Sequence, residues 1–202
     1  MTIIHFLDYL GVFVFAISGI LAASEKQLDL FGGFIIAFVT ALGGGTLRDL
    51  LLDVEIVWIS QVEYLYIVFA GGIFALVFKT FTKHIRKTML LFDTIGISLF
   101  TILGVQKGLA LGVPMEIAII FGAVTATFGG VIRDILCNEI PLIFRKEIYA
   151  TACISGALLY ALLNYFNVND LANTIISGSL IISIRTIAVV KKLRLPLVND
   201  KI

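Results

Sequence analysis

Two short runs of glycine, each followed by an adjacent Arg-Asp pair, are the residues of this chain whose types point to a chemical task. The first copy consists of Gly43, Gly44, Gly45, Arg48 and Asp49, and the second of Gly129, Gly130, Arg133 and Asp134. The shift along the chain that carries Arg48 onto Arg133 also carries Asp49 onto Asp134, and we call it the repeat shift. Charged side chains inside an apolar chain normally face a protein interior or a watery path, so we expect this motif to face the inside of a helix bundle or such a path.

The glycines admit two structural interpretations. Glycine costs about 1 kcal/mol relative to alanine in a helix interior, so two or three in succession predict a break. Lipid offers freed backbone groups no partner, and a broken helix must therefore line a cavity. Close packing of two helices is the alternative, because glycine also lets backbones approach each other. The charged pair that follows favours the break.

The Arg-Asp pairs are expected to lie at the two mouths of a central path. Neighbouring residues on a helix do not face each other, so Arg48 and Asp49 are predicted to be poor partners. Pairing of Arg48 with Asp134 across the repeat is not expected either, because Arg48 lies roughly 27 Å along a helix that begins near Leu30. Charges that merely extend to the lipid headgroups are the alternative.

Four further polar residues recur with the motif. Asp8 and Asp93 each lie near the start of an apolar span, where a carboxylate either stabilises the helix dipole or attracts a passing cation. Thr40 and Thr125 lie within one turn before the glycines. Their hydroxyls are expected to replace either a lost backbone partner or an ion's water.

The composition indicates an all-α integral membrane protein. Of 202 residues, 59% are apolar and 14% are charged, with a mean hydropathy of +1.06, whereas a soluble domain carries roughly 25% charged residues. A crossing helix needs about 20 mainly apolar residues, which leaves room for seven transmembrane helices. The predicted spans cover about 3–23, 30–52, 64–81, 89–111, 115–136, 147–166 and 171–190.

A repeat organises these spans. The repeat shift superimposes Asp8 on Asp93, Tyr64 on Tyr149 and both glycine motifs without a gap. Each copy contains three spans, an odd number, so the second copy must enter the membrane from the opposite side. We predict one membrane domain over residues 1–202, built from inverted repeats over 3–81 and 89–166 and an extra C-terminal helix over 171–190.

Lysine and arginine are distributed unequally between the two sides. If the link after span three is cytoplasmic, the other side holds only Arg48 and Lys107. The cytoplasmic side then holds a much larger set, namely Lys26, Lys79, Lys83, Arg86, Lys87, Arg133, Arg145, Lys146, Lys191, Lys192, Arg194 and Lys201. This asymmetry predicts an N-terminus outside and a C-terminus in the cytoplasm. A lipid-headgroup site is an alternative role for the basic patch.

The sequence carries no signature of catalysis, of a metal or of a cofactor. His5 and His84 have no metal-ligand partner at helical spacing, and the glycine runs do not form a dinucleotide fingerprint. Cys137 and Cys153 form neither a disulfide framework nor a metal-spaced cluster. We expect no enzyme activity, no cofactor and no nucleic acid partner.

The doubled motif, set in two three-span repeats plus one span, resembles the prokaryotic trimeric intracellular cation (TRIC) channel family and the bacterial glycine transporter domain proteins grouped with it. Residues 139–141 and 147–153 are similar to that bacterial branch. The resemblance implies a homotrimer in membrane lipid, with a separate cation path in each subunit lined by spans two and five. Phe128 replaces the first glycine of the second motif, which implies a stiffer or narrower break. The Lys-Glu-Val-type motif of the animal members has no match in span four.

Three functions remain open at this point. The first is a passive channel for monovalent cations, K⁺ and Na⁺, in the inner membrane of a prokaryote, gated by movement of the glycine-broken spans. In such a channel Asp49 and Asp134 concentrate cations, while Arg48 and Arg133 fix the broken segments or exclude multivalent ions. The second is a secondary transporter of a small zwitterion such as glycine, because inverted repeats with broken helices are equally typical of transporters. The third is a membrane scaffold without transport.

Overall fold

Helices account for almost all regular structure in the chain. The computed structural model describes residues 3–81 and 84–196, so Lys83 and Lys201 of the charge comparison lie outside the described residues. In chain order the helices are α1 (Ile3–Glu25), α2 (Leu30–Leu51), α3 (Val57–Ser60), α4 (Glu63–Phe78), η1 (Lys79–Phe81), α5 (Ile85–Ala110), α6 (Met115–Leu136), η2 (Leu142–Phe144), α7 (Ala150–Tyr165) and α8 (Asp170–Lys191).

Five of these helices, α1, α2, α5, α6 and α8, are long and apolar enough to cross a membrane. The helices α4 and α7 are apolar but have only 16 residues each. At 1.5 Å per residue each is about 24 Å long, which is shorter than a hydrocarbon core of about 30 Å. The 3₁₀ turn η1 extends α4 by three residues.

Several element boundaries differ from the expectation. The helix α5 begins at Ile85 rather than Met89, and α7 begins at Ala150 rather than Glu147. Glu147 lies outside the helix because its backbone pairs with that of Arg194 in an isolated bridge. The short helix α3 was not predicted, since its four residues are too few to show a period.

The helix starts follow local capping chemistry. Asp29 precedes α2 and its side chain accepts a hydrogen bond from the Gly32 amide at 2.6 Å, which satisfies one of the free amides of the first turn. Asn169 caps α8 in the same manner. Pro114 lies immediately before α6, where its missing amide removes no helical bond.

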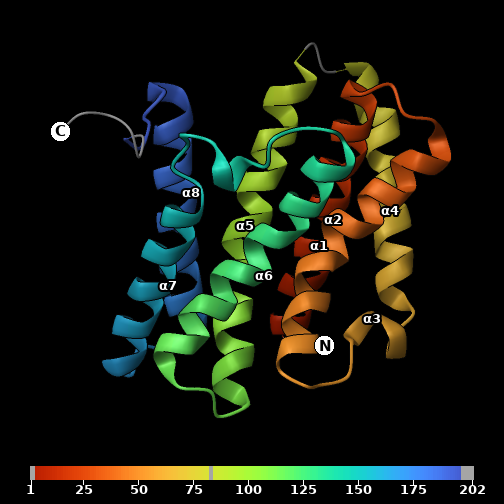
Figure 1. The fold of residues 1–202 in the computed structure, drawn as a ribbon. Helices are drawn as coiled ribbons and strands as arrows, with labels where there is room; N and C mark the ends of the chain where they lie inside the picture. Colours follow the sequence, from red (N-terminus) through yellow and green to blue (C-terminus); the bar gives the residue numbers. More distant parts are fainter. Residues whose placement is uncertain (1–2, 82–83, 197–202) are drawn as a thin grey trace.

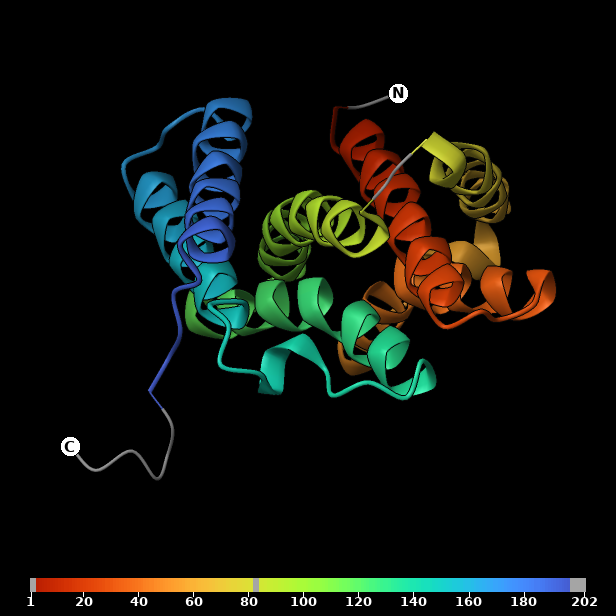
Figure 2. The same ribbon diagram turned by 90° about the horizontal axis from the view of Figure 1, so that it is seen from above.

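The helices α1, α2, α6 and α5 form a closed ring in which each packs against the next. The helix α4 packs outside on α1, while α7 and α8 lie together against α5 on the opposite side of the molecule, as Figure 2 shows. In Figure 1 the chain runs upward in α1 and downward in α5, and likewise in opposite directions in α2 and α6 and in α4 and α7. The helices related by the repeat shift are therefore antiparallel, as an inverted repeat requires.

The two ends of the bundle differ in charge. The described members of the basic set lie at the end where α1, α4, α6 and α8 finish and where α2, α5 and α7 begin, at the top of Figure 1. Arg48 and Lys107 lie in the last turns of α2 and α5, at the opposite end. The basic residues therefore gather at one end of the molecule, in agreement with the grouping made from the sequence.

Candidate functional site

The first charged cluster lies at the end of α2 and is called the α2 cluster: Asp8, Arg48, Asp49, Tyr64 and Lys107. The Arg48 Nε donates to Asp49 Oδ1 at 2.8 Å, and the Lys107 ammonium lies 2.8 Å from the same oxygen. The Tyr64 hydroxyl donates to the Asp8 carboxylate. Arg48 and Asp49 are both buried. Four different helices, α1, α2, α4 and α5, supply this cluster.

The second charged cluster lies at the end of α6 and is called the α6 cluster: Ser18, Asp93, Arg133, Asp134 and Tyr149. The Arg133 Nη1 donates to Asp93 Oδ1 at 2.7 Å and to the Ser18 hydroxyl at 2.8 Å. Its Nε donates to Asp134 Oδ1 at 2.9 Å. Arg133 and Asp93 are both 0% exposed. The arginine is thus held by two carboxylates inside the protein.

The two clusters occupy matched places at opposite ends of the helix ring. Arg48 and Arg133 each lie in the last turn of their helices, which run in opposite directions. Their details differ, because Lys107 has Ala22 as its counterpart under the repeat shift. In place of a lysine, Asp134 accepts a backbone hydrogen bond from Leu142 at 3.0 Å.

The prediction that neighbouring Arg and Asp side chains are poor partners is wrong. Both pairs form an Nε to Oδ1 contact, although their Cβ atoms point in different directions along the helix. The long arginine side chain can bend back, and inside a protein an unpaired charge is so costly that the nearest carboxylate is used. Among the described residues no ion pair joins Arg48 to Asp134, in agreement with the expectation.

The helix-dipole interpretation of Asp8 and Asp93 is also wrong, because neither α1 nor α5 has an acidic residue in its first turn. Asp93 is paired with Arg133, and Asp8 accepts from Tyr64. Sequence reasoning did not assign Tyr64, Tyr149, Ser18 and Lys107 to the site. The two tyrosines carried a usable signal, because they coincide under the same shift as the two aspartates.

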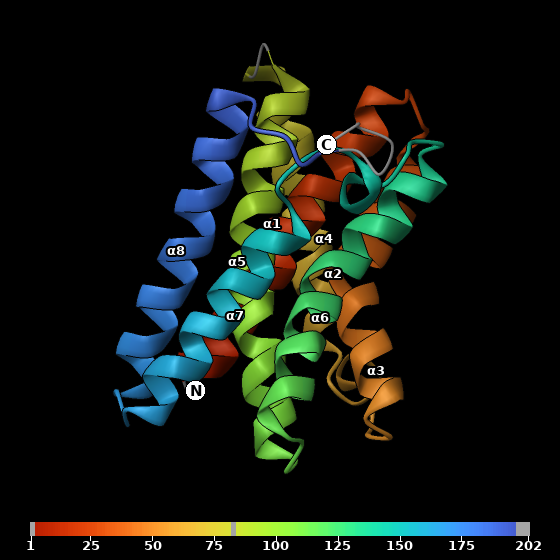
Figure 3. The same cartoon turned by 60° about the vertical axis from the view of Figure 1, so that its left-hand side comes forward.

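The prediction that glycines break the second and fifth spans is wrong. The helix is continuous from Leu30 to Leu51 and from Met115 to Leu136. A Cβ atom on Gly44 would lie 2.1 Å from the carbonyl oxygen of Thr125, and one on Gly129 would lie 2.2 Å from that of Thr40. The glycines therefore let α2 and α6 touch through their backbones, which is the close-packing alternative. Figure 3 shows the two helices side by side.

The other motif residues have milder contacts. A Cβ on Gly43 would approach the Ile132 side chain, and one on Gly45 would meet only the Arg48 guanidinium at 3.7 Å. A Cβ on Gly130 would lie 3.0 Å from the Tyr149 hydroxyl. The hydroxyls of Thr40 and Thr125 each donate at 2.6 Å to the carbonyl one turn earlier in their own helix. Because the helices are intact, these hydroxyls replace no lost backbone partner.

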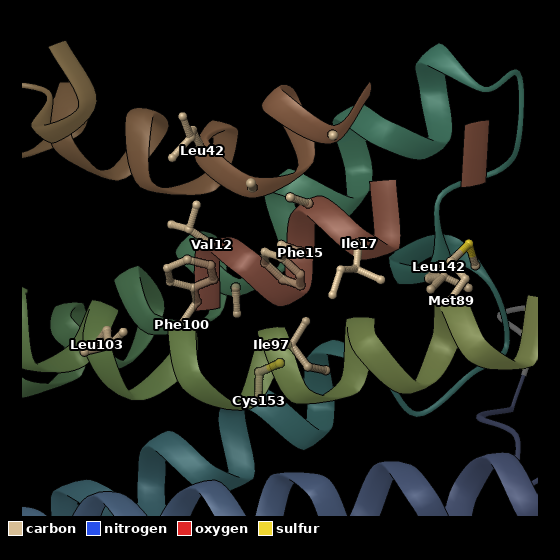
Figure 4. Packing of buried hydrophobic residues seen from close by; sticks show 14 of the residues in the cluster. Val12, Phe15, Ile17, Leu42, Met89, Ile97, Phe100, Leu103, Leu142 and Cys153 are labelled. Carbon is tan, nitrogen blue, oxygen red and sulfur yellow. The ribbon is translucent and has the colours of Figure 1, made fainter. Parts of the chain in front are cut away.

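An apolar layer separates the two clusters. Phe15 of α1 and Phe100 of α5 are related by the repeat shift, and their ring centroids lie 5.2 Å apart. Both rings are buried, and Figure 4 shows them between the helices with Val12 and Ile97. Glycine makes room for each ring, because a Cβ on Gly96 would lie 2.2 Å from Phe15 and one on Gly11 would lie 3.0 Å from Phe100.

Small cavities lie at both clusters. One of about 30 Å³ is lined by residues of the α2 cluster, including Asp8, Arg48 and Asp49, with Trp58 and Phe100. Another of about 40 Å³ at the opposite end is lined by charged residues, including Lys26, Arg86, Asp134 and Glu139. The two cavities share no lining residue. Each has room for a water molecule or two, so polar pockets lie on both sides of the apolar layer.

Three buried polar atoms in the α6 cluster have no hydrogen-bond partner among the described residues: Asp93 Oδ2, Arg133 Nη2 and the Tyr149 hydroxyl. Buried polar atoms are normally satisfied by protein or by water. The three atoms therefore leave hydrogen-bonding capacity at this cluster that the described residues do not use. The described residues contain no group of three or more His, Cys, Asp or Glu placed to hold a metal ion.

Comparison with protein families gives a match that repeats within the chain. A family model described as "Glycine transporter" matches residues 5–80 and again residues 90–165. The inner membrane protein YadS of Escherichia coli strain K12 is 38% identical over 165 residues, which cover 81% of this chain and 80% of YadS. The membrane protein YvgT of Bacillus subtilis is 35% identical over 159 residues, covering 77% of this chain and 78% of YvgT.

Solved structures of TRIC channels also match the fold of this chain. The crystal structures of the TRIC trimeric intracellular cation channel orthologue from Rhodobacter sphaeroides match with a TM-score of 0.91 and 33% identity, over 96% of this chain and 100% of that one. A structure described as a basis for conductance through TRIC cation channels matches with a TM-score of 0.86 and 32% identity over 100% of both chains. A TRIC counter-ion channel matches at 15% identity with a TM-score of 0.64, which shows a shared fold alone.

Proposed function

Because the chain belongs to the prokaryotic TRIC channel family, we propose that it is a passive channel for monovalent cations, K⁺ and Na⁺, with one path in each subunit of a homotrimer. Two matching solved structures are described as TRIC cation channels, and one of them as trimeric. The residues that match them cover nearly the whole chain, so the proposal draws on the complete fold rather than on one motif.

The observation that carries the proposal is the pair of charge clusters at opposite ends of one helix ring. A charged side chain in the hydrocarbon region costs at least about 2.5–3.5 kcal/mol and normally faces a bundle interior or a watery route. Here several such charges recur at symmetry-related places. Carboxylates of Asp49 and Asp134 would concentrate cations at the two mouths, while Arg48 and Arg133 hold them in place and repel multivalent cations. Asp8 and Asp93 would line the same route.

Closure of the path follows from the apolar layer. Phe15 and Phe100 fill the interior between the clusters, so an ion cannot pass without their movement. We expect the path to open when α2 moves against α6, because their contact at Gly44 and Gly129 consists of backbone atoms rather than interlocked side chains. Gly43, Gly45, Gly130, Thr40 and Thr125 flank this contact and would take part in gating.

The membrane arrangement proposed for the chain has seven spans: the five long helices together with α4 and α7. The N-terminus would lie outside and the C-terminus in the cytoplasm, because basic residues concentrate on the cytoplasmic side. The name of the E. coli relative places that protein in the inner membrane, and we propose the same location in a prokaryotic cell for this chain.

A secondary transporter of glycine is the second candidate, and the description of the matching family model favours it. In that function the α6 cluster would hold the zwitterion, with Arg133 facing its carboxylate and Asp93 facing its ammonium. The intact helices α2 and α6 remove one argument for this function, because broken helix ends would otherwise form the substrate site.

A flux assay separates the two functions. The purified chain is reconstituted in liposomes loaded with K⁺, and K⁺ efflux and glycine uptake are measured in parallel on the same preparation. The channel proposal predicts rapid K⁺ efflux that does not saturate at low concentration and no glycine accumulation. Saturable glycine uptake with no K⁺ efflux would contradict the channel proposal and support the transporter. The absence of both activities would contradict both and support a scaffold without transport.

A further inference from the structure

Arg185 of α8 is a buried arginine that lies outside both repeats. Its side chain is 0% exposed. The Nη1 donates to the Ile148 carbonyl at 2.8 Å and to the Glu147 carboxylate at 3.4 Å. The Nε and Nη2 have no hydrogen-bond partner among the described residues. A guanidinium carries five donors in a planar fork, so a large part of its hydrogen-bonding capacity is unused in a buried place.

Arg185 is one of the residues that line a cavity of about 150 Å³. Its lining comes from α5, from the link before α7 and from the end of α8: Leu90, Glu147, Ile148, Arg185, Ala188, Val189, Lys192, Leu193 and Arg194. Three of these side chains are cationic and only Glu147 is anionic. Neither Lys192 nor Arg194 has a side-chain ion pair within the described part of the chain. The cavity therefore has an excess of positive charge.

The cavity is built by specific backbone structure. The chain turns at Lys192, which adopts a left-handed conformation with φ of 53°. The following segment then runs back beside the link before α7. There the backbone of Arg194 forms an isolated antiparallel β-bridge with that of Glu147, and the Leu195 amide donates to the Lys146 carbonyl at 2.8 Å. The Arg185 guanidinium carbon lies 4.9 Å from the centre of the Tyr149 ring, which fixes its plane through a cation–π contact.

From this geometry we propose that the cavity binds an anionic phosphate group. A phosphate accepts two parallel hydrogen bonds from an arginine fork, and the unused Nε and Nη2 of Arg185 are adjacent donors that suit this arrangement. Lys192 and Arg194 supply further positive charge at the rim. Basic pockets between membrane helices on the cytoplasmic side bind lipid headgroups in other proteins.

Two sources can supply such a phosphate. One is the headgroup of an anionic phospholipid, because Ile187, Val190 and Leu193 are exposed around the end of α8 and would contact acyl chains. The other is free inorganic phosphate from the aqueous side. No residue of either charge cluster lines this cavity, and Arg185 contacts the α6 cluster through the Tyr149 ring. The binding of phosphate is measured directly, so its test does not require that the chain conducts ions.

The test measures binding to the full purified chain in detergent. Phosphatidylglycerol, phosphatidylcholine and inorganic phosphate are titrated in turn, with native mass spectrometry and the thermal unfolding midpoint as readouts. The variants are the double substitution Lys192→Gln and Arg194→Gln at the exposed rim and Arg185→Lys, which keeps the charge and loses the fork. Lys191→Gln is the matched control, because Lys191 is exposed on the same helix and does not line the cavity.

The proposal predicts that phosphatidylglycerol binds more tightly than phosphatidylcholine and that both the double substitution and Arg185→Lys weaken it by about tenfold. Lys191→Gln should leave the affinity unchanged. Binding of phosphatidylglycerol without binding of inorganic phosphate identifies a lipid, whereas binding of both with the same dependence on Arg185 identifies a general phosphate site. No preference for the anionic lipid and no phosphate binding would overturn the proposal, as would wild-type affinity in the double variant of a correctly folded protein.

Discussion

Gly44 of α2 lies so close to the carbonyl oxygen of Thr125 in α6 that a Cβ atom on the glycine would be 2.1 Å from it. The inverted repeat places Gly129 in the same relation to Thr40, at 2.2 Å. The two central helices are thus joined at two symmetry-related points by backbone contact. A contact of this kind admits no larger residue at either point.

Substitution of Gly44 by alanine should therefore destabilise the described conformation. The added methyl group meets backbone, which cannot move aside cheaply, and overpacking of this kind costs about 1–3 kcal/mol. We expect a lower thermal unfolding midpoint in detergent and a changed K⁺ flux in liposomes, and the same result for Gly129→Ala.

Gly45→Ala is the matched control within the motif, because a Cβ there would meet only the end of the Arg48 side chain at 3.7 Å. It should be neutral, or more stable by up to about 1 kcal/mol because alanine favours the helix. Gly178→Ala on α8 should behave in the same way, because an added Cβ there would meet no described heavy atom within 4 Å beyond the local helix backbone. Equal stability of the Gly44 and Gly45 variants would contradict the backbone-contact account.

The sequence allowed the repeat, its inversion and the matched positions of Thr40, Gly44, Thr125 and Gly129 to be predicted, because these depend on spacing alone. It did not allow the role of the glycines to be predicted. A glycine that breaks a helix and one that lets another helix approach look identical in sequence. What distinguishes them is the opposing backbone, which for Gly44 is that of Thr125, in the second copy of the repeat.

The pairing of charged side chains could not be predicted from helix geometry alone either. Helix geometry gives the direction of a Cβ atom, and on that basis Arg48 and Asp49 diverge. Burial changes the balance, because a charge removed from water takes the nearest carboxylate within reach. The partnership of Arg133 with Asp93, and that of Asp49 with Lys107, depends on how α5 packs against its neighbours, which no local pattern reports.

Removal of the Asp93 carboxylate should be much more damaging than removal of its counterpart. Asp93→Ala removes the carboxylate that accepts from Arg133 Nη1 inside the protein, and breaking a buried ion pair costs about 3–5 kcal/mol. Asp8 is half-buried and its described bond is with a neutral tyrosine, so Asp8→Ala should cost about 1–3 kcal/mol. Thermal unfolding of the two variants side by side makes the comparison, and a larger loss in Asp8→Ala would show that the assignment of the ion pair is incorrect.

Truncation of Phe100 should make the chain leak. The ring forms part of the apolar layer and also lines the cavity at the α2 cluster. Phe100→Ala removes this barrier, so basal K⁺ efflux from liposomes should rise. The substitution also costs about 3–5 kcal/mol of stability, and the variant is therefore first checked for unchanged oligomeric elution.

Phe69→Ala is the control for that leak, because Phe69 lies on α4, outside the helix ring, and the residue is 52% exposed. Its K⁺ efflux should equal that of the unmodified chain. If Phe100→Ala folds and remains as tight as the control, the apolar layer is not the barrier.

Neutralising Lys107 should change conduction while sparing the fold. Its ammonium shares Asp49 Oδ1 with Arg48, and its side chain is 27% exposed, so little packing is lost. Lys107→Gln leaves Asp49 with one cationic partner and raises the negative potential at that mouth. We expect a higher single-channel K⁺ conductance at low ionic strength, where screening is weak. An unchanged conductance would show that the Asp49 carboxylate does not act on ions in the path.

Cys137 gives a pH-dependent test of the end opposite the α2 cluster. It follows α6 and lines the cavity that includes Asp134, and burial raises its pKa above the ordinary thiol value. The thiolate is the reactive form, so a raised pKa means that a smaller fraction reacts at neutral pH and that the rate keeps rising above the usual titration range. Maleimide labelling in a Cys153→Ala background, compared with an exposed reference thiol at Ser60→Cys, measures this. A Cys137 rate that levels off at the same pH as the reference would contradict a buried thiol.

The measurement that tests the central claim most directly is the current carried by the purified chain in a planar bilayer under a KCl gradient. The account predicts discrete unitary steps whose reversal potential lies near that of K⁺, with smaller steps when Asp49 or Asp134 is replaced by asparagine. Steps that reverse at the Cl⁻ potential, or a silent bilayer from protein that takes up glycine in liposomes, would contradict a cation path between the two charge clusters.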